Sequence, residues 1–273
     1  MMERKEFLER FILVRKCAGC GEILPYERSS EAFCSECIAR WQMAKAENCS
    51  ECLRVVTECT CAPKGLKQSN GVRSLRKVIF YHPSRSCEPQ NKLIYFLKHQ
   101  ANARASLFAA RELSRALNEE LEACGFAERR DEVVIVNVPR GYRAKIRYGH
   151  DQSELICREL ATICGITYCG CIARNRRKSK EQKTLSVGKR FGNVLGAFSL
   201  KKEIDLSGKC VVLLDDIVTT GASMIACVRL LGAAGAKEIL ALCIAQNENN
   251  KASKKRKKAS KNTKNSKKKT TER

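Results

Sequence analysis

The spacing of hydrophobic and polar positions divides the chain into three zones. Between about residues 70 and 247, short apolar runs alternate with segments whose apolar residues recur every three or four positions. The short runs are rich in β-branched residues, and they predict strands over 72–81, 133–138, 211–214 and 238–245. The helical spacing predicts helices over most of 90–124, over 151–164 and over 223–232.

The order of these elements predicts the fold class. Strands and helices alternate, a pattern that gives right-handed crossovers and a parallel sheet. The run VVIVNV at 133–138 stops at Pro139 and is typical of a strand buried on both faces. The inner face of the 151–164 helix is expected to consist of Leu155, Cys157, Leu160 and Ile163. The central zone is therefore expected to be α/β, a parallel sheet flanked by helices.

The two ends of the chain lack this periodicity. Residues 1–66 hold eight closely spaced cysteines and few long apolar runs, so a small cysteine-rich domain is expected there. Residues 248–273 are mostly Lys, Asn, Ser and Thr, a composition that cannot offset the entropy cost of ordering. The predicted organisation is a cysteine-rich domain over 1–66, an α/β domain over 67–247 and a disordered Lys-rich tail over 248–273.

Charge constrains the partners of the chain. The 273 residues carry a formal net charge of +23. Residues 251–273 contribute twelve Lys or Arg and one Glu, so +11 lies in the tail and +12 on the remaining residues. A balance of this kind favours a polyanionic partner or an anionic substrate, and it says little about the fold.

Cysteine usage indicates the compartment. Seventeen cysteines is an odd number, which excludes complete internal disulfide pairing. The first residues, MMERKEFLERFILVRK, are charged and lack the apolar region of a secretory signal, and no run approaches the roughly 20 apolar residues of a membrane span. We therefore expect a cytoplasmic, reducing location without membrane insertion, where clustered cysteines more often bind metal than form disulfides.

The eight N-terminal cysteines are spaced as metal ligands. Two C-x-x-C pairs are followed by a third C-x-x-C and a C-x-C. Tetrahedral Zn²⁺ takes four thiolates, which leaves no open position for a substrate, so we expect two structural zinc sites. Consecutive and interleaved pairing both satisfy this spacing, whereas a thioredoxin-like redox site does not account for four adjacent pairs. The expected ligands are Cys17, Cys20, Cys34, Cys37, Cys49, Cys52, Cys59 and Cys61.

The segment VVLLDDIVTTGAS at 211–223 carries a ligand signal. Asp215 and Asp216 follow its apolar run at the carboxyl end of a strand, where ligands bind in open α/β sheets. Adjacent carboxylates suit the vicinal hydroxyls of a ribose, directly or through Mg²⁺. The hydroxyls, amides and helix N-terminus that favour a phosphate come from Thr219, Thr220, Gly221, Ala222 and Ser223. The chain has neither G-x-x-x-x-G-K-[ST] nor G-x-G-x-x-G, so nucleoside triphosphate hydrolysis and dinucleotide binding are not supported.

This segment resembles the phosphoribosyl diphosphate (PRPP) motif of type I phosphoribosyltransferases. Together with the cysteines it makes residues 17–245 similar to the ComF (ComFC) family of competence proteins. The resemblance also rests on VNVPR at 136–140, GHDQSEL at 149–155, EQKTLSVGKRFGNVLGAF at 181–198, and Lys98 in FLKHQ. The chain departs from the family at Tyr148, His150 and Asp151, where Arg, Phe and Asn are usual, and in its Lys-rich tail.

The resemblance implies a role for each segment. Asp215 and Asp216 would hold the ribose of PRPP and its Mg²⁺, and residues 219–223 would hold the 5′-phosphate. The residues expected to border the pyrophosphate are Pro139, Arg140 and Arg143. Residues 174–189 would form a mobile flap over the site. In an active transferase, Asp215 and Asp216 would be the catalytic pair.

Two functions are compatible with these features. The first is a competence protein of DNA uptake and natural transformation that binds PRPP and single-stranded DNA, with a helicase as partner. The second is an active phosphoribosyltransferase of nucleotide metabolism. The basic charge favours the first, because Lys and Arg attract phosphates regardless of base sequence. Aromatic residues make up 6% of the chain, and no base-stacking platform is expected from them.

Overall fold

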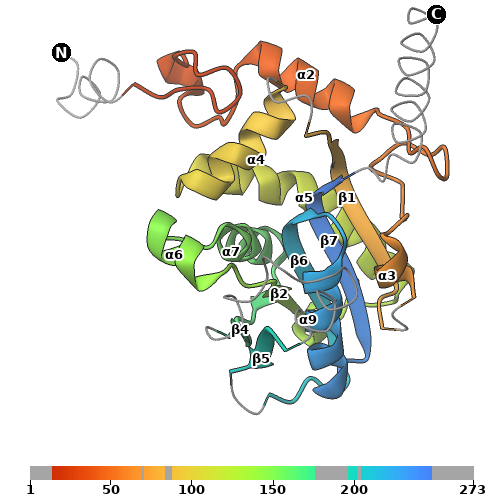
Figure 1. Cartoon of the computed structure of the whole chain (residues 1–273). Helices are drawn as coiled ribbons and strands as arrows, with labels where there is room; N and C mark the ends of the chain where they lie inside the picture. The colour runs from red at the N-terminus through yellow and green to blue at the C-terminus, as the bar shows by residue number, and fades with distance from the viewer. Residues whose placement is uncertain (1–13, 69–70, 84–87, 176–195, 202–203, 248–273) are drawn as a thin grey trace, which may run out of the picture.

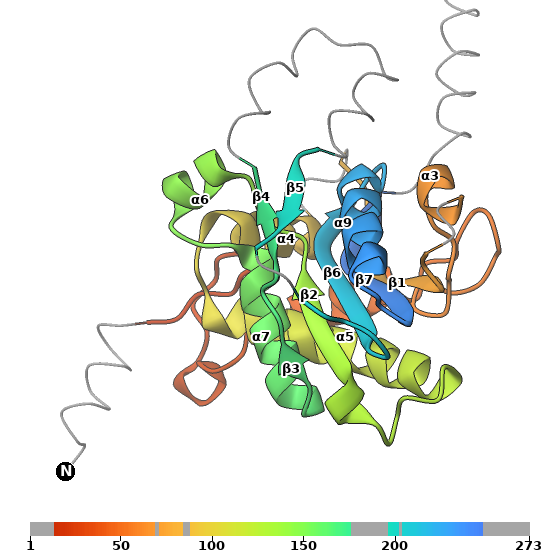
Figure 2. The ribbon, with the colours of Figure 1, turned by 90° about the horizontal axis from the view of Figure 1, so that it is seen from below.

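The computed structural model describes residues 14–68, 71–83, 88–175, 196–201 and 204–247. Its centre is a parallel sheet of five strands in the order β1-β7-β6-β2-β3 (Figures 1 and 2). The strands are β1 (Ser74–Tyr81), β2 (Val133–Asn137), β3 (Thr167–Tyr168), β6 (Cys210–Val218) and β7 (Glu238–Asn247). The expected parallel α/β architecture is therefore confirmed.

Alternate residues of β6 separate two halves of the core. Val212 and Leu214 face a layer that contains α4 (Pro89–His99), α5 (Ala103–Ala123) and α7 (Gln152–Cys164). Val211 and Leu213 face α3 (Lys64–Lys67) and α9 (Ala222–Ala233). Because a central parallel strand is buried on both faces, its sequence is apolar at every position and not at alternate ones.

Two of the expected boundaries differ in the structure. The predicted 90–124 helix is two helices, because Gln100 is extended and the Asn102 side chain caps α5 by accepting from the amide of Ala105 at 3.0 Å. Strand β6 continues past Leu214 to Val218, so the acidic pair lies within the strand. Strands β1, β2 and β7 agree with the expected positions to within about two residues, whereas the short strands β3, β4 and β5 were not expected.

The expected inner face of the 151–164 helix was partly wrong. Ile163 is 41% exposed and Leu155 is only half-buried, whereas Cys157 and Leu160 are buried as expected. The buried stripe of α7 continues instead through Ala161 and Cys164, which keep the three- and four-residue spacing of one helix face. Small side chains complete the face, and apolar character alone does not identify them.

The cysteine-rich segment packs into the same core as the sheet domain. Trp41 lies on α2 (Ser35–Lys45), and its ring contacts Phe33 and Phe108 at centroid distances of 5.9 and 5.2 Å. Its Nε1 donates to Glu112 of α5 at 2.9 Å. Leu66, at the expected boundary between 1–66 and 67–247, is buried against α9. The division into these two domains stays a prediction.

Two further expectations, the flap and the Lys-rich tail, concern segments that lie mostly outside the described residues. A small antiparallel pair, β4 (Ile172–Arg174) with β5 (Phe198–Leu200), lies on either side of residues 176–195 in the sequence. The predicted flap at 174–189 therefore lies outside the described residues except for its first two positions, and the tail at 248–273 lies wholly outside them. Among the described helices, none combines the length and the apolar character that crossing a membrane requires.

Candidate functional site

The acidic pair, Asp215 and Asp216, lies in the second half of β6. Because successive side chains of a strand alternate, the two carboxylates point to opposite faces of the sheet. Asp216 is buried, and its Oδ2 accepts from Gln152 Nε2 at 2.8 Å and lies 3.6 Å from Lys98 Nζ. Asp215 is partly buried. Burial, and then the neighbouring charge of Asp216, raises the pKa of Asp215 well above its usual range. A ligand cation or hydroxyl at this place would supply the polar partner that the charged form needs.

The loop after β6 delivers a helix N-terminus to the same end of the sheet. Thr219 and Thr220 are exposed, and Thr220 Oγ1 accepts from the amide of Ala222 at 3.4 Å. Gly221 has φ +74° and begins α9 without a side-chain cap. A Cβ at this glycine would lie 3.4 Å from Leu66 Cβ, so the loop is pressed against α3 from the cysteine-rich side. The amide of Ala222 is taken by Thr220, but the next amides of this first turn, of Ser223 and Met224, have no carbonyl partner within the helix and are available to an anion.

The opposite wall of the site follows β2. The backbone amide of Arg140 donates to Asp151 Oδ2 at 2.8 Å, and Lys145 Nζ lies 3.1 Å from the same oxygen. Ser153 Oγ donates to the carbonyl of Val138 at 2.9 Å. The start of α7 therefore fixes the position of the loop at 139–141. Arg140 Nη1 is buried and has no hydrogen-bond partner among the described residues, which leaves a guanidinium donor for a ligand.

These groups surround one cavity of about 250 Å³. Of the residues expected from the sequence, the cavity is lined by Pro139, Arg140, Asp215, Asp216 and Ser223. Lys98, matched earlier to a family lysine, also lines it. The expected residues that do not line it are Arg143, Thr219, Thr220, Gly221 and Ala222.

Besides Lys98, five lining residues were not among the expected site residues: Gln152, Ser153, Val138, Gly141 and Arg174. The motif GHDQSEL contains the first two, so the signal was present in the sequence but carried no assigned role. Arg174 ends β4, and the sequence analysis named it only as the first residue of the predicted flap at 174–189. Together the lining offers carboxylates, three cations (Lys98, Arg140 and Arg174) and amides, which is a donor set for a phosphorylated sugar and its metal ion.

The eight N-terminal cysteines form two groups, and in each the four sulfur atoms lie within 4.8 Å of one another. The groups are Cys17, Cys20, Cys34 and Cys37, and Cys49, Cys52, Cys59 and Cys61. Consecutive pairing is therefore confirmed and interleaved pairing is wrong. Four mutually close sulfurs fit the tetrahedral coordination of a closed metal site.

Backbone amides support a thiolate in both groups. Cys17 Sγ accepts from the amides of Gly19 at 3.3 Å and Cys34 at 3.2 Å, and Cys49 Sγ accepts from Glu51 at 3.4 Å. Burial acts to raise the pKa of Cys17, but these hydrogen bonds outweigh it and lower the pKa to about 7. A deprotonated sulfur near neutral pH is the form that ligates metal.

The two groups begin with the same local structure. We call the segments that carry the two cysteine groups the first knuckle (residues 16–37) and the second knuckle (residues 48–61). An antiparallel bridge joins Lys16 to Ile23 in the first knuckle, and an equivalent bridge joins Asn48 to Val55 in the second. Gly21 has φ +83° in the first knuckle. At the equivalent position of the second, Leu53 has φ +62°, a left-handed conformation that favours glycine.

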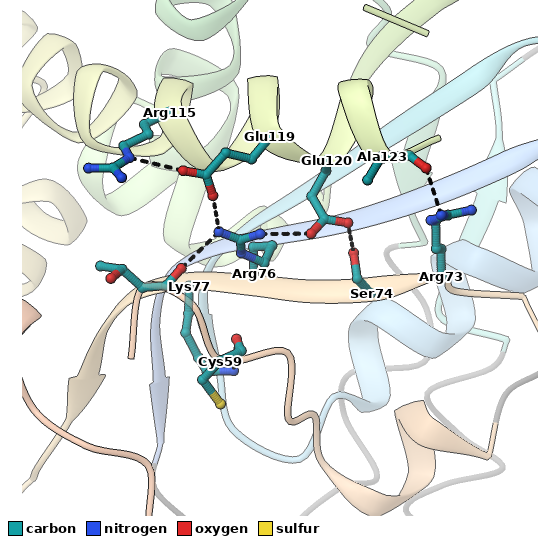
Figure 3. A network of polar contacts seen from close by, with 10 residues as sticks. Cys59, Arg73, Ser74, Arg76, Lys77, Arg115, Glu119, Glu120 and Ala123 are labelled. Atoms are coloured by element: carbon teal, nitrogen blue, oxygen red, sulfur yellow. Dashed lines mark hydrogen bonds and ion pairs between the residues drawn. The ribbon is translucent and has the colours of Figure 1, made fainter. Parts of the chain in front are cut away.

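Strand β1 holds the second knuckle through two successive cations. Lys77 is buried, and its Nζ donates to the carbonyls of Cys59 at 3.0 Å and Cys61 at 2.7 Å. Arg76 points to the other face, where it donates to the carbonyl of Thr57 and lies between two glutamates of α5 (Figure 3). The cysteine-rich segment and the sheet thus share polar contacts as well as a hydrophobic core.

Four cysteines of the sheet domain lie in the hydrophobic core: Cys157, Cys210, Cys227 and Cys243. All four are buried. Burial raises the pKa of Cys243 and of Cys210 to about 12, which keeps these thiols protonated. They therefore belong to the packing of the core.

Comparison with known proteins identifies the family to which a chain with this fold and this cavity belongs. A model of the phosphoribosyl transferase domain matches residues 102–272, and the chain belongs to that family. Over 234 residues, 82% of this chain and 96% of the relative, it is 24% identical to competence protein ComFC of Streptococcus pneumoniae (strain ATCC BAA-255 / R6). The resemblance to ComF proteins is thereby confirmed.

A second relative is the DNA utilization protein YhgH of Salmonella typhi. The two are 33% identical over 112 residues, which are 41% of this chain and 48% of that protein, so the chain spans about half of its length. Among solved structures, the purine phosphoribosyltransferase of Pyrococcus horikoshii Ot3 aligns with 51% of this chain and 73% of its own, with 22% identity and a TM-score of 0.30.

Proposed function

We propose that this chain is a competence-type protein that binds PRPP with Mg²⁺ in the cavity at the ends of β2 and β6, and that also binds single-stranded DNA. One observation carries the PRPP half. The cavity brings the acidic pair of β6 together with Lys98, Arg140 and Ser223, which come from three other parts of the chain. The family membership supports a phosphoribosyl ligand.

PRPP presents three kinds of group, and the cavity has a counterpart for each. Asp215 and Asp216 would hold the ribose hydroxyls and the Mg²⁺, since carboxylates are its preferred protein ligands. The amides at the start of α9, with Ser223, would bind the 5′-phosphate. Lys98 and Arg140 would bind the pyrophosphate, with Arg143 at the rim.

The proposed binding of single-stranded DNA is supported by the charge of the chain and by the names of its relatives. The net charge of +23 gives an attraction to phosphates that is independent of base sequence. Relatives are called competence protein ComFC and DNA utilization protein YhgH. A role in DNA uptake and transformation, with a competence helicase as partner, belongs to this proposal.

We also propose Zn²⁺ as the ion of both cysteine groups. All eight donors are thiolate sulfurs, and closed sites of four cysteines are characteristic of structural zinc. These sites would stabilise the fold and take no part in chemistry on PRPP.

An active phosphoribosyltransferase of nucleotide metabolism is the second candidate, favoured by the family to which the chain belongs. In such an enzyme the bond between C1 of the ribose and pyrophosphate breaks, and the residues of the cavity stabilise the leaving charge. Release of pyrophosphate from PRPP in the presence of purine or pyrimidine acceptors would favour this candidate. Binding without release would favour the first.

Titration calorimetry with PRPP and Mg²⁺ tests the site. The wild type is expected to bind, and Asp215→Ala/Asp216→Ala to lose binding at least tenfold. Asp205→Ala is the matched control, because this exposed carboxylate lies before the start of β6, away from its carboxyl end. Absence of PRPP binding by the wild type, or equal binding by the double variant, would refute the site.

A further inference from the structure

A row of rings and cations crosses from α4 to α6 (Tyr142–Tyr148) and ends at the cavity. The rings of Tyr95 and His99 lie 4.0 Å apart with an interplanar angle of 30°. His99 meets the ring of Tyr148 edge-on at 4.8 Å. The guanidinium of Arg140, which lines the cavity, lies 4.6 Å from the centre of the Tyr148 ring. The sequence alone did not predict this row, because Tyr148 lies about 50 positions after Tyr95 and His99.

Hydrogen bonds hold the two helices of this row together. The buried His150 places Nδ1 2.8 Å from the carbonyl oxygen of Tyr148 and Nε2 3.0 Å from that of Leu97. One ring therefore links the end of α6 to the last turn of α4. His99 Nδ1 also lies 2.6 Å from the carbonyl oxygen of Tyr95. The aromatic row is thus positioned before any ligand arrives, which lowers the entropy cost of binding.

The helices that carry the row are positively charged along their length. The sequences of α4, PQNKLIYFLKH, and of α6, YRAKIRY, contain no acidic residue. Lys92, Arg143 and Arg147 are exposed on them. Two helices that combine an exposed ring with cations and carry no carboxylate of their own are suited to the bases and phosphates of a single strand.

Tyr95 also borders a second cavity, of about 550 Å³, between α4 and the first knuckle. Tyr81, Phe96 and Lys92 line this cavity with it, and Lys16 and Gly21 close it from the knuckle. Figure 1 shows the first knuckle, α4 and α6 following one another along one side of the molecule. Tyr95 is 66% exposed, so its ring is accessible to a ligand.

We propose that the row of Tyr95, His99 and Tyr148 is a base-stacking track for single-stranded DNA, which runs from the cavity at the first knuckle to the rim of the acidic cavity. The proposal rests on the DNA-binding half of the proposed function. Bases stack on the exposed ring of Tyr95, and phosphates lie along Lys92, Arg143 and Arg147. Unpaired bases expose the faces that such rings contact, whereas a duplex keeps them stacked on each other.

Fluorescence anisotropy of a labelled oligo-dT with the full chain tests this track. Tyr95→Leu keeps an exposed apolar side chain with good helix propensity but removes the ring, and Tyr95→Phe keeps the ring and removes the hydroxyl. Stacking on one residue predicts that Tyr95→Leu weakens binding about 5- to 100-fold, while Tyr95→Phe stays within about twofold of the wild type. The salt dependence should not change, because no phosphate contact is lost.

Arg158→Gln is the control for a similar pair outside the track, since Arg158 lies 4.5 Å from the centre of the Tyr168 ring and is exposed. It should bind as the wild type does. A wild type that does not bind the oligonucleotide would refute DNA binding itself. A wild type that binds, with Tyr95→Leu equal to it or Tyr95→Phe as weak as Tyr95→Leu, would refute the track alone. Tighter binding of a duplex of the same length would also refute the track.

Discussion

Arg76→Met tests how much of the stability depends on the buried charges between β1 and α5. The Arg76 residue is 8% exposed. Its Nη1 lies 2.8 Å from Glu120 Oε1, and its Nη2 lies 2.5 Å from Glu119 Oε2 and 2.9 Å from the carbonyl of Thr57 (Figure 3). Methionine keeps much of the apolar stem, so the substitution removes the charge and its hydrogen bonds more than it removes volume.

The expected loss of stability depends on how well the two glutamates are paired once Arg76 is removed. Glu120 is 7% exposed and keeps, among the described residues, the hydroxyl of Ser74 at 2.5 Å as its donor. Breaking a buried ion pair by removing one partner costs about 3–5 kcal/mol. Glu119 is more exposed and keeps Arg115, so its share is below about 1 kcal/mol. We expect the free energy of unfolding to fall by about 3–5 kcal/mol.

Urea unfolding in reducing buffer with zinc measures this loss through the fluorescence of Trp41, the single tryptophan, which is buried. Arg115→Met is the control. The Arg115 side chain is 90% exposed, and its ion pair with Glu119 should contribute less than about 0.5 kcal/mol. A loss below about 1 kcal/mol for Arg76→Met, or a loss equal to the control, would refute the reasoning. Adding Glu120→Gln to Arg76→Met should recover part of the loss.

Three further predictions concern the knuckles and the acidic pair. Leu53→Gly should raise the free energy of unfolding by roughly 0.5–1 kcal/mol, because it relieves a left-handed conformation, and urea unfolding that shows a loss would contradict this. Asp215→Asn should raise the melting temperature at neutral pH by an amount that shrinks as the pH falls. The pKa of Asp215 is raised in the folded protein, so the stability that its neutral form provides is lost as the pH rises through that value; melting curves of the two proteins that run parallel from pH 5 to 8 would argue against it. Metal analysis should find two zinc ions per chain in the wild type and one in Cys52→Ser, with a lower melting temperature, whereas two ions in the variant would exclude the second site.

Local patterns in the sequence predicted the parts of the fold that depend on neighbours along the chain. The four long strands β1, β2, β6 and β7, the α/β class and the loop at 219–223 are of this kind, whereas the short strands β3, β4 and β5 were not predicted. The break between α4 and α5 was missed because the apolar spacing continues across it, and Asn102, a residue that favours helix caps, marked it.

The arrangement of the site depended on contacts that no local pattern encodes. Gln152 reaches Asp216 across 64 positions, and the grouping of the cysteines followed from how the knuckles fold. In contrast, the acidic pair and the helix that follows it were enough to predict what kind of ligand the cavity would hold. The identity of its other wall, with Arg174 and Gln152, required the structure.

The contact between the second knuckle and β1 also bears on aggregation. Strand β1 forms one edge of the sheet, and its sequence SLRKVIFY is rich in β-formers. Phe80 packs against Cys49, Val56 and Cys59, and Lys77 binds carbonyls of the same knuckle. An edge strand without such a cover can pair with strands of other molecules. We therefore expect zinc starvation to convert the protein into aggregates at concentrations where the metal-loaded form stays dispersed.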